Sequence, residues 1–267
     1  MEEDRWPPGA GPARGRRMGI AVIGRSRRWD GERWTHRALL RAGHVATLVD
    51  DRRAFRALDR RGAGAWVRAR IEAFGPARSI VTRAIGVPAD VPREPCAAVP
   101  SLMWSRDLRI PPDPATLERA ACVDTTFLTA GGHAPLLEAV GARRASCLPD
   151  GVEPMVDRPA APHPEYACDI AFIGATGEED RVAFPGRVAR SFRVRTWGNG
   201  RESVGGEPGW MGRPAYGIER YVADDAARDR VRAAGRALVL AHHPLDHRIR
   251  SLVTGAPFQN PLVEPAA

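Results

Sequence analysis

Lysine is absent from this sequence, so all 40 basic residues are arginine. Their excess over the 32 acidic residues gives a net charge of +8, a value that suggests a nucleic-acid partner. The arginines are, however, spread over the whole chain. In Glu32–Ala42 they recur at Arg33, Arg37 and Arg41, the spacing of a solvated helix face. We therefore attribute the charge to GC-rich codon usage and expect no nucleic-acid partner.

Long apolar segments are missing as well. No run approaches the roughly 20 residues that a membrane-spanning helix needs, so we expect no membrane span. Residues 1–17 are rich in Pro, Gly and Arg and contain no apolar stretch. They predict a disordered extension rather than a secretory signal, with Met18 as an alternative start. The expected location is cytoplasmic.

Cysteine is scarce, and no two cysteines form a C-x-x-C pair. This pattern argues against a zinc site and against a disulfide framework, and it predicts buried reduced thiols. No other metal-ligand constellation is visible, and we expect neither a metal nor a cofactor. The four cysteines are Cys96, Cys122, Cys147 and Cys168.

Short apolar runs alternate with helical patterns over the first half of the chain, which indicates an α/β fold with a parallel sheet. Together they predict a doubly wound, Rossmann-like domain over residues 18–157. The expected strands are Gly19–Gly24, Val45–Val49, Ser79–Thr82, Ala97–Trp104, Val123–Thr129 and Ala145–Leu148. The expected helices are Glu32–Ala42, Trp66–Phe74, Ala115–Ala121 and His133–Val140.

A proline-rich linker, residues 158–168, precedes a second set of elements. We expect a second Rossmann-like domain over residues 169–253 and a tail over residues 254–267. Its expected strands are Asp169–Gly174 and Arg193–Trp197, and its expected helices are residues 178–190 and Ala226–Ala241.

An acid at the end of the second strand, Asp50, invites a dinucleotide-binding interpretation. The loop Gly24–Gly31 lacks the G-x-G-x-x-G sequence, and it carries arginines where a pyrophosphate needs bare backbone. An NAD-type oxidoreductase is therefore a weaker alternative.

Several motifs follow one another in an order typical of one family. They are Leu148–Pro154, Asp169–Gly174, Trp197–Gly200, Trp210–Arg213, Ala215–Gly217 and Tyr221–Asp225. On these motifs the chain from Met18 to Val253 resembles the CgeB/YkvP-like (spore maturation protein-like) bacterial glycosyltransferases, which have the two-domain GT-B architecture. The resemblance implies transfer of a sugar from a nucleotide-sugar donor to an unknown acceptor. It also implies that the donor contacts the second domain and the acceptor the first.

The chain departs from the family pattern in one place. The family's Arg-x-Phe-Glu segment, whose acid is expected to hold the nucleotide ribose, does not occur. Instead, Tyr216-Gly217 leads almost directly into Glu219. We therefore expect an incomplete second domain. A non-catalytic remnant that acts as a binding module is the alternative function.

Candidate site residues follow from the rule that ligands bind at the carboxyl ends of parallel strands. As catalytic or acceptor-binding acids we expect Asp107 and Asp30, although Asp107 also fits a turn or a helix cap. Asp150 is expected to shape the linker turn. Expected donor-binding residues are Gly174, Thr176, Gly198 and Asn199, and the family resemblance adds His243 and Arg248; expected acceptor-side residues are His133 and Trp104.

Overall fold

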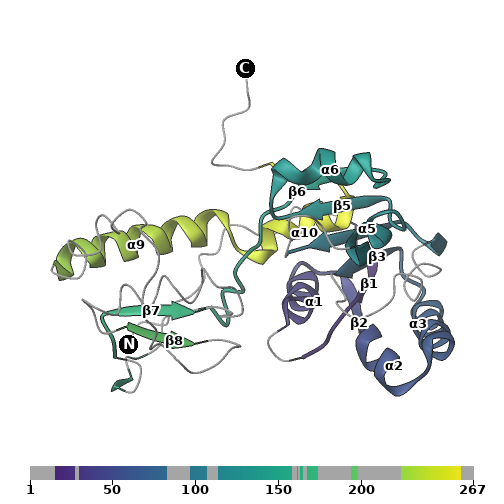
Figure 1. Cartoon of the computed structure of the whole chain (residues 1–267), viewed down its shortest axis with the longest axis horizontal. Coiled ribbons are helices and arrows are strands. Elements are labelled where there is room, and N and C mark those ends of the chain that lie inside the picture. The colour runs from purple at the N-terminus through teal and green to yellow at the C-terminus, as the bar shows by residue number, and fades with distance from the viewer. Residues whose placement is uncertain are drawn as a thin grey trace, which may run out of the picture. The chain divides into compact units, whose positions relative to one another are not determined.

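A computed structural model describes residues 16–27, 30–82, 97–106, 114–157, 161, 163–164, 167–173, 194–197 and 224–259. The chain divides into two compact units (Figure 1). The first unit is Met1–Asp157 with Leu238–Ala267, and the second is Arg158–Ala237. Most of the predicted N-terminal extension lies outside the described residues.

The first unit is built on a six-stranded parallel sheet in the order β2-β1-β3-β4-β5-β6. In this doubly wound order the chain reverses direction across the sheet between β1 and β3, and ligands of such sheets bind at that point. The predicted α/β class is confirmed. The strands are β1 Gly19–Ile23, β2 Val45–Val49, β3 Arg78–Thr82, β4 Ser101–Ser105, β5 Thr125–Leu128 and β6 Ala145–Cys147.

Helices cover both faces of this sheet because alternate residues of each strand point to opposite sides. In β1, Ile20 and Val22 join one apolar cluster with α1 and α10, and Ala21 and Ile23 join the other with α2 and α3. The helices are α1 Gly31–Arg41, α2 Asp51–Ala57, α3 Arg60–Phe74, α5 Pro114–Ala120, α6 Ala134–Ala139 (after the 3-10 turn η1 Gly131–His133) and α10 Leu245–Thr254.

The α2–α3 pair differs from the sequence prediction. The short helix α2 was not expected, and α3 begins at Arg60 rather than near Trp66. Two aspartates account for the difference by capping these helices. The Asp50 carboxylate accepts a hydrogen bond from the Arg53 backbone N–H at 2.8 Å, and that of Asp59 accepts one from Gly62 at 2.6 Å.

Helix α10 belongs to the first unit, whereas the expected boundaries place it in the second domain. Its apolar residues Leu245, Ile249 and Leu252 are buried in the cluster that contains α1. An ion pair between Arg41 of α1 and Asp246 of α10, 2.9 Å long, links the two helices. Burial of this face explains why the last helix packs with residues 200 positions earlier in the sequence.

The described part of the second unit contains β7 Ile170–Ile173 and β8 Val194–Trp197, which pair in parallel. Both strands match the prediction, and the expected helix over residues 178–190 lies outside the described residues. The long helix α9 Asp225–His242, expected at Ala226–Ala241, contains the boundary between the units.

Three cysteines of the described residues are free thiols, and each is partly rather than fully buried. They are Cys122, Cys147 and Cys168, while Cys96 lies outside the described residues. The prediction of buried thiols is therefore wrong in degree of burial. Among the helices that the structure describes, none is long and apolar enough to cross a membrane.

Candidate functional site

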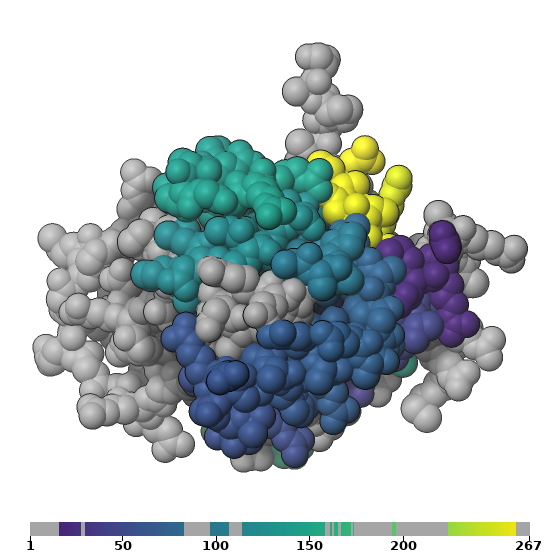
Figure 2. All heavy atoms as spheres, turned by 90° about the vertical axis from the view of Figure 1, so that its right-hand side faces the viewer, coloured from purple at the N-terminus to yellow at the C-terminus, as the bar shows by residue number. Residues whose placement is uncertain are grey.

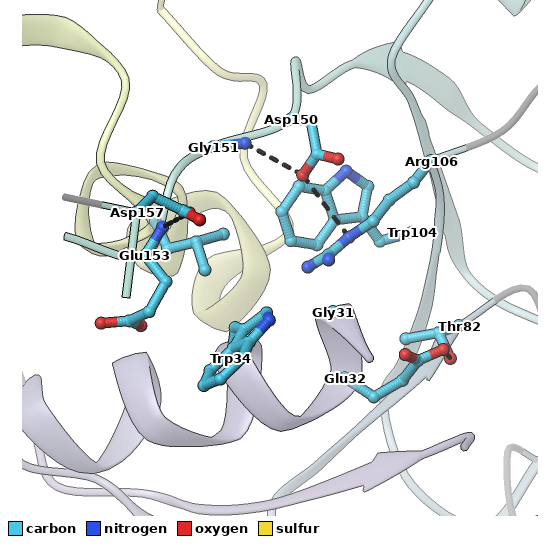
Figure 3. A pocket seen from close by; sticks show the side chains of 11 residues that line it. Gly31, Glu32, Trp34, Thr82, Trp104, Arg106, Asp150, Gly151, Glu153 and Asp157 are labelled. Atoms are coloured by element: carbon cyan, nitrogen blue, oxygen red, sulfur yellow. Dashed lines mark hydrogen bonds and ion pairs between the residues drawn. The ribbon is translucent and has the colours of Figure 1, made fainter. Parts of the chain in front are cut away.

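A cavity of about 270 Å³ opens at the carboxyl ends of β1, β3 and β4, beside the reversal point of the sheet (Figure 3). All of its lining residues belong to the first unit. We call it the sheet-edge pocket. It is lined by Gly31, Glu32, Trp34, Thr82, Trp104, Arg106, Asp150, Gly151, Glu153, Asp157 and Leu245.

Glu32 and Thr82 form one wall of the sheet-edge pocket. Thr82 ends β3, and its hydroxyl donates a hydrogen bond to Oε1 of Glu32 at 2.7 Å. Glu32 lies in the first turn of α1, where the helix dipole stabilises a negative charge. Both side chains are buried. The pair therefore fixes a carboxylate at the rim of the sheet.

Arg106 supplies the positive charge of the pocket. Its guanidinium stacks 4.0 Å from the ring centroid of Trp104 and donates a hydrogen bond to Oγ1 of Thr35 at 2.6 Å. A Cβ atom at Gly31 would lie 1.5 Å from its Nη1, so the close approach of Arg106 to α1 requires glycine at this position. Stacking and hydrogen bonding thus hold the cation against the start of α1.

Asp150 projects into the pocket opposite Arg106 (Figure 3). Its Oδ1 accepts a hydrogen bond from the Gly151 N–H at 2.9 Å and lies 3.6 Å from Nε of Arg106. The side chain remains 53% exposed. Asp150 is therefore a positioned carboxylate that solvent and ligands can reach.

Arg248 of α10 stabilises the turn that contains Asp150. Its fully buried guanidinium donates hydrogen bonds to the backbone oxygens of Pro149, Asp150 and His242. Nη2 also lies 2.8 Å from Nδ1 of His243. Burial, and then the charge of Arg248, lowers the pKa of His243. These expected donor-binding residues therefore stabilise the turn from outside the pocket lining.

Glu153 closes the opposite wall. Its carboxylate, only 1% exposed, receives two hydrogen bonds from Arg41, at 2.8 and 2.9 Å. Its backbone N–H donates to Oδ2 of Asp157 at 2.8 Å. Because this bidentate pair engages both oxygens of Glu153, Asp157 is the more accessible carboxylate on this side.

The other expected site residues line the pocket, lie elsewhere in the first unit, or fall outside the described residues. Trp104 lines the pocket, and its Nε1 donates to the backbone oxygen of Leu148 at 3.1 Å. Asp30 does not line it: Oδ2 accepts from the Arg27 N–H at 2.8 Å, and Oδ1 pairs with Arg25 at 2.6 Å, so this buried acid closes the loop before α1. His133, in η1, is also absent from the lining. Asp107, Gly174, Thr176, Gly198 and Asn199 lie outside the described residues.

Sequence reasoning missed most of the pocket. Thr82 and Arg106 could have been found, because each stands at the carboxyl end of an expected strand. The unpredicted acids of the pocket do not stand at the ends of expected strands, so no pattern in the sequence pointed to them. They come together only through tertiary packing. The unpredicted lining residues are Gly31, Glu32, Trp34, Thr82, Arg106, Gly151, Glu153, Asp157 and Leu245.

Asp50 is the acid at the end of the second strand on which the dinucleotide-binding interpretation depends. One carboxylate oxygen accepts hydrogen bonds from Ser26, at 3.2 Å from N and 2.5 Å from Oγ, and the other caps α2. An acid engaged in this way is not positioned to bind a ribose. Within the described ranges, no group of three or more His, Cys, Asp and Glu side chains could hold a metal ion.

Comparison with known proteins gives distant structural matches alone. No family model matches the chain, and no curated protein matches it. The chain is similar to the crystal structure of the glycotransferase of kitacinnamycin, with 14% identity, a TM-score of 0.43, and coverage of 73% of this chain and 69% of that one. It is also similar to the lipopolysaccharide outer core galactosyltransferase WaaB in its apo form, with 12% identity, a TM-score of 0.38, and coverage of 67% and 60%. Similarity this weak concerns the fold and assigns no activity.

Proposed function

We propose that this protein is a glycosyltransferase-like protein whose first unit binds a hydroxylated acceptor, such as a saccharide, in the sheet-edge pocket. The observation that carries the proposal is the combination of the Trp34 indole with the exposed carboxylates of Asp150 and Asp157 at the reversal point of a doubly wound sheet. The family resemblance of the sequence motifs suggests a nucleotide-sugar as donor, bound by the second domain.

The balance of polar groups supports this choice of ligand. Four lining residues carry carboxylates and one, Arg106, carries a cation. Sugar hydroxyls can donate hydrogen bonds to carboxylates, and the C–H faces of a sugar ring pack on indoles such as Trp34. The two exposed carboxylates, Asp150 and Asp157, together with the Trp34 indole therefore suit a polyhydroxylated ligand.

Asp150 is our candidate for the base that accepts the proton of the acceptor hydroxyl. It is exposed and lies opposite Arg106, which can orient its carboxylate. Asp30 is less suited because both of its oxygens are engaged by arginine residues of its own loop. A positioned general base contributes roughly 10²–10⁴-fold to the rate of such a reaction.

The first test is binding of a panel of mono- and disaccharides, measured by saturation-transfer NMR and calorimetry. Trp34→Ala should weaken binding about 2- to 12-fold, because an aromatic contact is worth about 0.5–1.5 kcal/mol. Trp66→Ala removes an indole outside this pocket and should leave saccharide affinity unchanged. If no saccharide of the panel binds at millimolar concentration, the assignment of this pocket is wrong.

The second test is hydrolysis or transfer of uridine, guanosine and thymidine diphosphate-sugars. Asp150→Asn should reduce turnover at least about 100-fold with little change in saccharide affinity. Asp229→Asn, an exposed change on α9, is the matched control. Saccharide binding without turnover of any donor would contradict the transfer reaction and leave a binding module.

A further inference from the structure

A second cavity, of about 780 Å³, lies beside the edge strand β2 and shares no lining residue with the sheet-edge pocket. We call it the β2 groove. Helices α2 and α3 form its other walls, and Figures 1 and 2 show this helix pair at the surface of the first unit, in blue. Its volume falls in the range of about 300–1,000 Å³ that small-molecule sites occupy.

The walls of the β2 groove are mainly apolar. Trp66 and Phe74 of α3 line it together with Val49 of β2, and Leu58 lies at the turn between the helices. Leu58 is 43% exposed, and no described residue covers this exposed part of its side chain. An elongated apolar body can therefore bury surface here that is otherwise in contact with water.

Two cations border this apolar surface. Arg53 lines the groove, and within the described residues it forms no ion pair. The guanidinium of Arg70 lies 5.1 Å from the ring centroid of Trp66, a contact with an aromatic ring and not with an acid. The nearby carboxylate, Asp50, is already engaged by Ser26 and by the N-terminus of α2. The charge of both arginines is thus available to a ligand.

The free edge of β2 adds a polar contact. Val45 N–H donates to Met18, and Val49 accepts from Gly24, so odd-numbered residues of β2 turn their backbone groups toward β1. The backbone groups of Leu48 consequently point away from β1, at the unpaired edge of the sheet. They can bond an ester or amide group of a ligand.

We propose that the β2 groove binds an anionic amphiphile, a phosphate monoester that carries an apolar chain. The phosphate contacts Arg53 and Arg70, since guanidinium groups bind phosphate oxygens in a bidentate manner. The chain lies along the rings of Trp66 and Phe74 and beside Leu58. Such a ligand is either a free metabolite or a lipid with a phosphate headgroup.

The test compares octyl phosphate, uncharged 1-octanol and inorganic phosphate by calorimetry on the full chain, below the micelle concentrations. Octyl phosphate should bind at least tenfold more tightly than either of the others. Sedimentation with phosphatidylcholine vesicles, with and without phosphatidic acid, distinguishes the two sources. Binding of octyl phosphate alone supports a free metabolite, and additional binding to the acidic vesicles supports a lipid. Affinity for 1-octanol equal to that for octyl phosphate overturns the proposal, as does binding to vesicles without binding of octyl phosphate.

Matched variants locate the site. Arg53→Gln/Arg70→Gln should weaken the binding of octyl phosphate at least tenfold and leave the affinity for 1-octanol unchanged. Arg33→Gln/Arg250→Gln removes the same charge outside the groove and should change neither affinity. Equal loss in both double variants means that net charge alone attracts the anion, which overturns the proposal. Because the four positions are on helix surfaces, thermal melting of all variants verifies that they fold.

Discussion

Asp51 makes the stability of this protein depend on pH. It is the first residue of α2 and is 0% exposed, and neither carboxylate oxygen has a well-formed hydrogen bond within the described chain. Burial raises the pKa of Asp51 from 3.8 to about 7, against the opposing effect of Arg119 and with smaller contributions from the acids Asp50 and Glu32. In the folded protein the carboxyl group is thus largely neutral below pH 7.

The direction in which stability changes with pH follows from the protons bound by the folded and unfolded states. Between pH 3.8 and about 7 the folded state holds a proton on Asp51 that the unfolded state has released, so stability falls as the pH rises through this window. One pH unit corresponds to about 1.4 kcal/mol. Between pH 5 and pH 9 the wild type should therefore lose about 3 kcal/mol through this residue.

Asp51→Asn removes the titration and keeps the shape of the side chain. We expect urea denaturation at pH 5, 7 and 9 to give a variant whose advantage over the wild type grows by about 3 kcal/mol across the series. Asp59→Asn is the control, because Asp59 is exposed and asparagine also caps helices. A difference between wild type and Asp51→Asn that stays constant with pH would refute the reasoning.

Two further changes test the pocket and its support. Gly31→Ala places a methyl group where Arg106 lies. We therefore expect saccharide affinity to change at least fivefold, while the unfolding free energy stays within about 1 kcal/mol of the wild-type value. Gly64→Ala is the control, because Gly64 of α3 faces open space, and it should change neither quantity. Arg248→Met leaves three backbone carbonyls without their donor and should cost more than about 3 kcal/mol in urea denaturation. Arg250 is exposed on the same helix, so Arg250→Met should cost under about 0.5 kcal/mol of unfolding free energy. Equal losses in the two variants would contradict the stabilising role of the Arg248 hydrogen bonds.

Local pattern was enough for the regular elements of the first unit. Val45–Val49 was predicted to the residue, because a run of apolar residues between turn signals is typical of a buried parallel strand. The helix expected at Ala115–Ala121 is α5, Pro114–Ala120, which begins at a proline, a residue favoured at the first helical position. Helix α2 was not expected because its seven residues, three of them arginine, show no apolar period.

Interactions that are distant in the sequence decided the rest. The order of strands predicts that a pocket lies at the carboxyl edge, but it does not say which acids are engaged there. Asp30 is held by Arg25, and Glu153 is held by Arg41, more than 100 positions away. Whether a carboxylate is accessible depends on these partners, and no short motif records them.

Helix α10 illustrates the same limit. No helix was expected at Leu245–Thr254, although Leu245, Ile249 and Leu252 have the spacing of one buried helix face. Which surface covers that face depends on the shape and charge of α1, including the pair of Arg41 with Asp246. The sequence by itself therefore determined that helices and strands form and which faces they bury. Only the tertiary structure decided which faces meet, because burial is non-directional and complementary partners become neighbours only when the chain has folded.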